Sequence, residues 1–335
     1  MKPRRIYPPT LNNSQSSNNT QHQKGVGVYL DYAASTPADP AVVEAMESYF
    51  SDKFGNPGSL HSFGQTALGA VDKARETIAK AINADFREII FTGSATEANN
   101  LVLRGVVKAA RFISRGTESS LAPAASDSLG SRRGDTRSAR DQARRDSEAF
   151  RSKQIAPPNP NIFLKPKIII SSIEHESVLE TARDLEKGGA EVVYIPVDKN
   201  GVVSVKKIKE ALDEKTILVS VMYVNNEIGS VQPIAEISEL IRNWKLKIKN
   251  SSGYPLVHTD AAQALNYFDC DIKKLGVDLM TLSGQKIYGP KGIGALFVKN
   301  QNFGSDFIAP IITGGGQEFG LRSGTENVPL IVGFA

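Results

Sequence analysis

Residues 255–286 read PLVHTDAAQALNYFDCDIKKLGVDLMTLSGQK, and this stretch contains the pattern that decides the fold. Two short apolar runs, 255–259 and 277–282, are each followed by polar residues that can carry chemistry. Asp260 follows the first run directly, and Lys286 closes the segment after the second run. Short apolar runs that alternate with amphipathic stretches are typical of a mostly parallel sheet wrapped by helices.

The same alternation extends through the rest of the chain. Further strands are expected at 88–92, 167–172, 190–196, 216–224 and 292–298. Apolar residues at helical spacing predict a helix within 203–213, and Pro233 is expected to open the next helix. The predicted fold class is therefore α/β, a mostly parallel sheet flanked by helices.

The bulk composition predicts a soluble protein with a substantial core. The chain has 335 residues, of which 40% are hydrophobic, enough for one large domain or two smaller ones. No apolar run approaches the roughly 20 residues of a membrane-spanning helix, and no secretory signal opens the chain. Cys270 is the single cysteine, so no internal disulfide and no cysteine-built metal site are expected, and we predict a cytoplasmic protein with no bound metal.

Three regions separate by composition. Residues 1–25 are predicted to be a disordered tail, and residues 26–335 a single domain that binds a cofactor. Residues 114–165 interrupt that domain with a Ser-, Arg-, Ala- and Asp-rich stretch, which predicts a disordered insertion. This insertion carries ten Lys/Arg and six Asp/Glu, and the remainder holds 30 of each, so the +4 formal charge comes from the insertion alone. Solvation explains such a charge run better than nucleic-acid binding does.

Reactive residues follow most of the predicted strands. In an open α/β sheet, ligands bind beyond the carboxyl ends of the strands, so these residues are expected to converge. The sets are Gly93-Ser94-Ala95-Thr96-Glu97, Glu174-His175, Asn225-Asn226-Glu227, Asp260, and Ser283-Gly284-Gln285-Lys286. Tight turns do not require His, Lys or paired Asn, which favours a shared site over turn chemistry.

The five sets together match the needs of pyridoxal phosphate, whose aldehyde requires a lysine and whose ring nitrogen requires a carboxylate. Lys286 is predicted to be the Schiff-base lysine, with Lys291 as the nearest rival and an ordinary surface lysine as the plain alternative. Asp260 is predicted to pair with the pyridine nitrogen, although a helix cap is an alternative role for it.

The remaining candidates would hold the other parts of the cofactor. His175 is expected on the ring face, where it can stack and move protons. Backbone amides at the start of a helix near 96–112 are expected to bind the phosphate. The candidate phosphate contacts are Ser94, Ala95, Thr96 and Ser283. Asn225 and Gln263 are candidate hydrogen-bond donors to the phenolic oxygen, and both amides equally suit a capping role.

These residues resemble the cysteine desulfurases of the class V aminotransferase group, across residues 28–335 apart from the insertion. The resemblance rests on the order and spacing of several motifs. They are YLDYAASTP (29–37), FGNPGSLHSFG (54–64), IIFTGSATEANN (89–100), IEHESVL (173–179), ILVSVMYVNNEIGSVQPI (217–234), HTDAAQ (258–263), LSGQKIYGPKGIGAL (282–296) and GGGQEFGLRSGTENVP (314–329).

The resemblance implies a fold-type I pyridoxal-phosphate enzyme that works as a homodimer. It assigns to Lys286, His175, Asp260 and the phosphate and phenolic contacts the same roles, and it gives Thr325 a phosphate contact in the neighbouring subunit. Gln285 stands where the family usually has a phosphate-assisting histidine, which implies somewhat weaker cofactor binding. The implied reaction takes sulfur from L-cysteine, leaves alanine, and passes a persulfide to an iron–sulfur scaffold or a tRNA thiolation protein.

The resemblance also implies a small domain after the ENVP segment, bringing a nucleophilic cysteine and a substrate-binding arginine. The chain ends at Ala335, so we expect it to be C-terminally incomplete and unable to finish sulfur transfer alone. Cys270 does not match the family's nucleophile and is expected to be a packing residue. Alternatives are a selenocysteine lyase, an aminotransferase, or a non-catalytic subunit that binds the cofactor.

Overall fold

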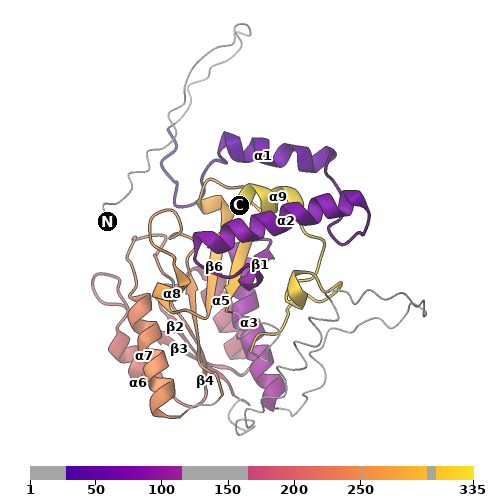
Figure 1. The fold of residues 1–335 in the computed structure, drawn as a ribbon. Coiled ribbons are helices and arrows are strands. Elements are labelled where there is room, and N and C mark those ends of the chain that lie inside the picture. Colours follow the sequence, from indigo (N-terminus) through magenta and orange to yellow (C-terminus); the bar gives the residue numbers. More distant parts are fainter. Residues whose placement is uncertain (1–27, 115–164, 250–251, 300–306) are drawn as a thin grey trace, which may run out of the picture.

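A seven-stranded sheet forms the centre of the protein (Figure 1). The computed structural model describes residues 28–114, 165–249, 252–299 and 307–335. The strands are β1 (Ile89–Thr92), β2 (Lys167–Ser171), β3 (Glu191–Ile195), β4 (Thr216–Ser220), β5 (Leu256–Asp260), β6 (Leu279–Ser283) and β7 (Gly294–Val298). Each of the seven predicted runs forms a strand, so the α/β fold class is confirmed.

Strand direction places most carboxyl ends at one edge of the sheet. The order is β1-β7-β6-β5-β4-β2-β3, and the pairs from β6 through to β3 are parallel. β7 is antiparallel to both β6 and β1, so β1 runs in the same direction as the parallel strands. The residues that follow β1, β2, β4, β5 and β6 therefore meet at one edge, as the sequence predicts.

The helices connect the strands and cover both faces of the sheet. They are α1 (Pro40–Ser51), α2 (Ser62–Ala81), α3 (Ala95–Ser114), α5 (Glu176–Lys187), α6 (Val205–Ala211), α7 (Ile234–Lys247), α8 (Ile272–Leu275) and α9 (Val328–Phe334). α6 lies within the predicted range 203–213, and Pro233 immediately precedes α7, which confirms both expectations. Figure 1 shows α1, α2 and α9 gathered at one end of the sheet.

Side-chain alternation along the strands produces two cores, one on each face. In β1, Ile89 and Phe91 join the core under α2 and α7, whereas Ile90 joins the core under α3. Both faces are covered, so the strands read as continuous apolar runs and not as an alternation of apolar and polar residues. Each large apolar side chain buried in this way stabilises the fold by about 1.5–3 kcal/mol.

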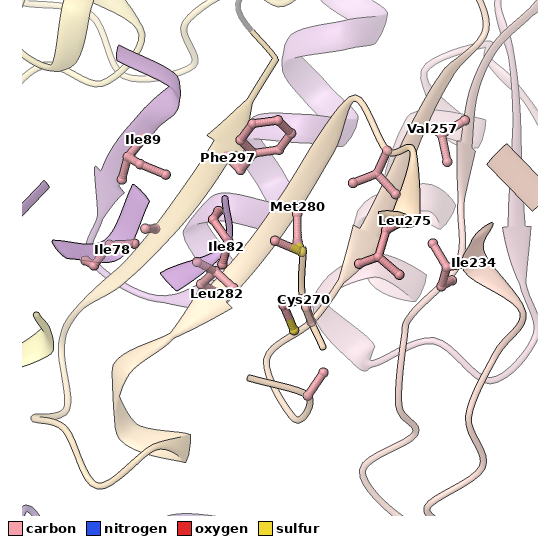
Figure 2. Packing of buried hydrophobic residues seen from close by; sticks show 14 of the residues in the cluster. Ile78, Ile82, Ile89, Ile234, Val257, Cys270, Leu275, Met280, Leu282 and Phe297 are labelled. Atoms are coloured by element: carbon pink, nitrogen blue, oxygen red, sulfur yellow. The ribbon is translucent and has the colours of Figure 1, made fainter. Parts of the chain in front are cut away.

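Cys270 belongs to the first of these cores. Figure 2 shows its side chain among those of Leu275, Met280 and Leu282. The side chain is 3% exposed, and burial together with the neighbouring Asp269 raises the pKa of its thiol to about 12. The expectation that Cys270 is a packing residue is confirmed, because a buried thiol in its protonated form is a poor nucleophile.

β4 is shorter than the predicted run 216–224. Ser220 is the last β4 residue that pairs with β2, and the chain then loses its neighbour on that side. Beyond Ser220 only the β5 side continues, where the amides of Val221 and Tyr223 donate to the carbonyls of His258 and Asp260. Apolar composition alone could not reveal this, because Val221, Met222 and Val224 remain buried after pairing with β2 stops.

A segment near the start of the described chain crosses the carboxyl edge of the sheet. We call residues 31–36 the strap. Its last residue, Thr36, donates through its amide and its hydroxyl to the carbonyl of Gln285, at 3.1 and 3.0 Å, and accepts from the Tyr288 amide at 2.8 Å. These bonds fix the strap against the loop that contains Lys286.

Two predicted regions fall outside the described ranges: the tail at 1–25 and all but the ends of the insertion at 114–165. The predicted domain boundaries therefore stay predictions. Within the described ranges, no helix has both the length and the apolar character that a membrane crossing requires.

Candidate active site

Asp260 lies at the centre of the carboxyl edge, at the last position of β5. It is buried, its Oδ1 accepts from the Ala262 amide at 2.9 Å, and its Oδ2 accepts from Asn99 Nδ2 at 2.7 Å. Burial raises its pKa above the ordinary value, while Asn99, Ala262 and the positive charges of His175 and Lys286 act in the opposite direction. The predicted imidazole and the predicted lysine therefore both lie within electrostatic reach of Asp260.

Lys286 enters this site from the short 3-10 helix Gly284–Lys286 that follows β6. Its Nζ donates to two strap carbonyls, those of Ala33 and Ala34, the latter at 2.8 Å. Partial burial lowers the pKa of the amine, although the carboxylates of Asp31 and Asp260 act to raise it. A lowered pKa increases the fraction of neutral, nucleophilic amine, which is the form that condenses with an aldehyde.

The strap also holds Gln263, a predicted cofactor contact. Gln263 Nε2 donates to the Ala33 carbonyl at 2.8 Å, the same oxygen that accepts from Lys286. The structure thus brings Gln263 and Lys286 to a common acceptor. The sequence analysis did not anticipate that the strap would supply it, because backbone carbonyls leave no signature in residue type.

His175 occupies the position between β2 and α5. Its exposed ring caps α5: Nδ1 accepts from the Ser177 amide at 3.1 Å and lies 2.9 Å from Ser177 Oγ. The residue therefore has a structural role as the cap of α5. It also lies close to Asp260, because Asn99 bonds both Asp260 and Ser177, and Ser177 Oγ lies 2.9 Å from His175 Nδ1.

The turn between β1 and α3 has the form of an anion site. Ser94 Oγ accepts from the Glu97 amide at 3.1 Å, so Ser94 caps the helix. The amides of Ala95 and Thr96 belong to the first helical turn, where no intrahelical acceptor exists, and Thr96 is exposed. Such free amides at a helix start favour a phosphate.

Close packing fixes this turn against the sheet. A Cβ added to Gly294 at the start of β7 would lie 2.7 Å from the Ser94 carbonyl carbon and 2.8 Å from the Ala95 nitrogen. Glu97 holds the turn from the other side, since it accepts from the Gly93 amide at 3.0 Å and from Arg322 Nε at 2.8 Å. The two free amides are therefore held in a defined position.

Three further candidates line the same region less directly. Ser283 is buried at the end of β6, and its hydroxyl has no hydrogen-bond partner within the described part of the chain. Gln285 is half-buried, and its carbonyl, not its side chain, binds the strap. Thr325 is exposed, and the proposed contact with a neighbouring subunit stays a prediction because one chain is present.

Asn225 is engaged within its own turn. Its Oδ1 accepts from the amides of Glu227 and Ile228, both at 2.9 Å, and its Nδ2 donates to the Ile173 carbonyl at 2.9 Å. A weaker contact joins Nδ2 to Met222 Sδ at 3.4 Å. This geometry is the turn-capping alternative, and it leaves one Nδ2 proton with only a sulfur acceptor.

Two residues that the sequence analysis did not select contact the predicted site residues directly. Asn99 and Ser177 are both buried, and Asn99 Nδ2 donates to Ser177 Oγ at 2.8 Å as well as to Asp260. The available signal was Asn99 itself, a polar residue on the apolar face of α3 that also carries Val102, Leu103 and Val106.

The family comparison agrees with this geometry. The sequence pattern of the family described as Aminotransferase class-V matches residues 28–120 and 158–335. The internal gap in the match, 121–157, falls inside the predicted insertion, and residues 1–27 are also unmatched.

Curated relatives and solved structures give a consistent result. "Cysteine desulfurase IscS 1" of Archaeoglobus fulgidus is 40% identical over 306 residues, covering 91% of this chain and 63% of the relative. "Cysteine desulfurase IscS" of Rickettsia massiliae is 40% identical over 307 residues, covering 91% of this chain and 60% of the relative. The chain thus spans about three fifths of the length of these relatives.

Two solved structures share the fold. "SspA in complex with cysteine" has a TM-score of 0.69 at 36% identity and covers 91% of this chain and 70% of that chain. "NIFS-LIKE PROTEIN" has a TM-score of 0.68 at 34% identity and covers 92% of this chain and 67% of that chain. These likenesses confirm the expected cofactor, pyridoxal phosphate, on which enzymes of this class depend. The match over most of its length shows that this chain belongs to the class-V aminotransferase family.

Proposed function

We propose that this chain is the cofactor-binding part of a cysteine desulfurase, which removes sulfur from L-cysteine and leaves L-alanine. The observation that supports the proposal is the position of Asp260 at the carboxyl edge of the sheet: hydrogen bonds through Asn99 and Ser177 join it to His175, and it lies close enough to Lys286 for their charges to interact. The names of the relatives, several of which are cysteine desulfurases, support the choice of substrate.

The chemistry of the donor set fits pyridoxal phosphate. Asp260 would meet the ring nitrogen, Lys286 the aldehyde, and the free amides of Ala95 and Thr96 the phosphate. The Ser283 hydroxyl, which has no partner in the described ranges, is a further donor for the phosphate. When bound, the cofactor supplies an electron sink for the electron pair left by a departing proton.

The residues of this chain would divide the work of the reaction. Lys286, with its lowered pKa, is suited to accept the substrate α-proton at Nζ. Asn99 and Ala262 donate to the two oxygens of Asp260 and favour its charged form, whereas burial raises its pKa, and Asp260 would pair with the ring nitrogen. His175 presents an exposed imidazole that can stack on a flat ring. We propose hydrogen bonds from Asn225, Gln263 and Gln285 to the cofactor as secondary contacts.

Cys270 is unsuited to accept the substrate's sulfur. Its thiol is buried in the core and its pKa is raised to about 12, so it holds almost no thiolate at neutral pH. A thiol other than Cys270 would therefore take the sulfur. We propose that an iron–sulfur scaffold or a tRNA thiolation protein receives it afterwards, in the cytoplasm.

We further propose a homodimer in which Thr325 reaches the phosphate of the partner subunit. Support comes from large apolar side chains left exposed between α1 and α2: Phe54 is 67% exposed and Leu60 is 94% exposed. Patches of this kind mark interfaces in soluble proteins. A Thr325→Ala variant should then weaken cofactor binding only under conditions where sedimentation shows the dimer.

The experiment for the main proposal uses the visible absorbance of bound cofactor. The chain is mixed with pyridoxal phosphate, and we expect a visible band that Lys286→Ala abolishes. Lys291→Ala is the matched control, since Lys291 lies exposed five residues further along and should leave the band intact. If Lys291→Ala removed the band instead, the assignment of Lys286 would be wrong.

L-cysteine addition then separates the desulfurase from its rivals. We expect L-cysteine to shift the band at lower concentration than L-alanine or L-serine. A shift with selenocysteine alone, or with amino-group acceptors and donors but not with cysteine, would replace the desulfurase with another class-V activity.

A further inference from the structure

A buried amide connects two of the site residues that lie on different elements. Asn99 in α3 is fully buried, and its Nδ2 donates to Asp260 Oδ2 at 2.7 Å and to Ser177 Oγ at 2.8 Å. A primary amide nitrogen has two protons, so these two bonds use both of them. Asn99 therefore joins the end of β5 to the first turn of α5.

The orientation of this amide is set by charge. Asn99 Oδ1 is buried and has no hydrogen-bond partner in the described residues. Turning the amide by half a rotation would place its oxygen against the Asp260 carboxylate, so two acceptors would face each other and that hydrogen bond would be lost. The unpartnered oxygen costs free energy, and it persists because both amide protons are committed to Asp260 and Ser177.

The direction of the next hydrogen bond follows from the first. Ser177 Oγ accepts a hydrogen bond from Asn99, so the hydroxyl proton of Ser177 is available to be donated to another group. The acceptor is His175 Nδ1, 2.9 Å away, which also accepts from the Ser177 amide at 3.1 Å. Two donors converge on Nδ1, so in the neutral ring this nitrogen carries the lone pair and Nε2 carries the proton.

We propose that Asn99 and Ser177 are positioning residues that connect the Asp260 carboxylate to His175 and hold its imidazole in the Nε2–H form. The Asn99 amide donates to both the Asp260 carboxylate and the Ser177 hydroxyl, and the hydroxyl in turn donates to the His175 imidazole. Its importance for catalysis rests on the proposed function, since a fixed tautomer determines whether the exposed ring nitrogen offers a proton or a lone pair. The hydrogen-bond chain itself requires no cofactor.

The test observes the histidine tautomer directly in cofactor-free protein. The sequence has four histidines, so long-range ¹H–¹⁵N spectra of histidine-labelled protein contain few signals, and His175→Gln identifies the relevant one. At a pH where the ring is neutral, we expect roughly tenfold preference for Nε2–H in the unsubstituted protein, the bias of about one net hydrogen bond. A predominant Nδ1–H form would overturn the proposal.

Substitutions then locate the cause. Asn99→Ala and Ser177→Ala should both shift the His175 ring toward the mixture of Nδ1–H and Nε2–H tautomers found in free histidine. The effect should be smaller in Ser177→Ala, because the backbone amide of residue 177 still donates to Nδ1. Asn100→Ala is the matched control: its side chain, next along α3, contacts Arg104, Thr181 and the Thr96 carbonyl and lies outside the chain of bonds. An unchanged His175 signal in Ser177→Ala would overturn the proposal even if Asn99→Ala failed to fold.

The cofactor measurement keeps this result separate from the proposed function. If the His175 tautomer depends on Asn99 and Ser177 but the protein forms no visible absorbance band with pyridoxal phosphate, the proposed positioning role is supported and the proposed function is wrong. If the absorbance band forms and neither Asn99→Ala nor Ser177→Ala changes the His175 tautomer, the proposed function is supported and the positioning role of Asn99 and Ser177 is wrong.

Discussion

Glu174 accepts a hydrogen bond from the backbone amide of Met222 at 2.7 Å, while its second oxygen, Oε2, is buried without a partner among the residues described. The same Oε1 accepts from the Ser171 hydroxyl. Burial raises the pKa of Glu174 to about 8, against the opposing effect of both hydrogen bonds and with a further rise from the Asp260 charge. At neutral pH the folded protein therefore holds a proton on Glu174 that the unfolded chain releases.

This proton makes stability depend on pH. Between the ordinary pKa of 4.5 and about 8, the unfolded state binds fewer protons at Glu174 than the folded state, so the free energy of unfolding falls as pH rises. Glu174→Gln imitates the neutral acid and should remove this fall. Urea unfolding at a series of pH values measures the difference, and parallel curves for the two proteins would contradict the prediction.

His258 should act in the opposite direction at lower pH. Burial lowers its pKa to about 3, and its ring nitrogens contact the hydroxyls of Ser220 and Thr281 at 2.8 and 3.1 Å. Below 6.5 the unfolded chain gains a proton that the folded protein refuses, so stability is lost as pH falls from 6.5 toward 3. Relative to wild type, His258→Gln should flatten this acid limb in urea unfolding, whereas His61→Gln, at the exposed start of α2, should leave it in place.

Breaking the buried ion pair between Arg75 and Glu318 should lower the free energy of unfolding more than breaking an exposed ion pair does. Arg75 donates to both carboxylate oxygens at 2.7 and 2.8 Å, and both side chains are almost fully buried. Arg75→Met should lower the free energy of unfolding by about 3–5 kcal/mol, because it leaves a buried charge unpaired. Arg75→Met combined with Glu318→Met should recover part of that loss.

An exposed pair on the same helix provides the control. Lys80 and Glu76 are 3.9 Å apart with both side chains largely exposed, so Lys80→Met should change stability by less than about 1 kcal/mol. Equal losses for Arg75→Met and Lys80→Met in chemical unfolding would show that burial does not govern the Arg75 pair.

Gly294→Ala should weaken cofactor binding by displacing the start of α3. Its Cβ would press on the Ser94–Ala95 backbone, which supplies the candidate phosphate amides. We expect affinity for pyridoxal phosphate to fall roughly tenfold or more, as small displacements at a binding site do. Gly69→Ala is the control, because its Cβ would meet nothing within 4 Å and should stabilise α2 by up to about 1 kcal/mol. Unchanged affinity in Gly294→Ala would remove this turn from the phosphate site.

Cys270 should be unreactive in the folded protein. Mass spectrometry after brief treatment with a thiol reagent should find Cys270 unmodified at neutral pH, and modified once urea exposes it. Cys270→Ala should leave the visible cofactor band unchanged and cost about 1 kcal/mol of stability. Rapid labelling of the native protein would contradict the thiol pKa of about 12.

The sequence predicts the sheet because buried strands form apolar runs. It predicts the site positions of Asp260, which directly follows one run, and of Lys286, which comes four residues after the end of another. The prediction made β4 too long. The end of β4 depends on where β2 stops pairing with it, and the sequence of one apolar run does not contain this information. Strand pairing of this kind is set by tertiary context and not by composition.

The site was predicted less completely than the fold. Ala33 and Ala34 contribute backbone oxygens, so their side chains give no indication of the contact with Lys286. Asn99 lies between His175 and Asp260 in space but is 76 residues before one and 161 before the other in sequence. Only the packing of α3 against the sheet brings these groups together.

The Arg75–Glu318 pair also affects the edge of the sheet that is formed by β1. β1 is an outermost strand, and such strands normally offer unpaired backbone groups to any extended peptide. Here Arg75 donates to the carbonyl of Ile89, and Glu318 accepts from the amide of Phe91 at 2.7 Å, so two side chains occupy those groups. These two side chains thereby hinder the addition of another chain's strand at this edge of the sheet, so the ion pair is expected to oppose aggregation there.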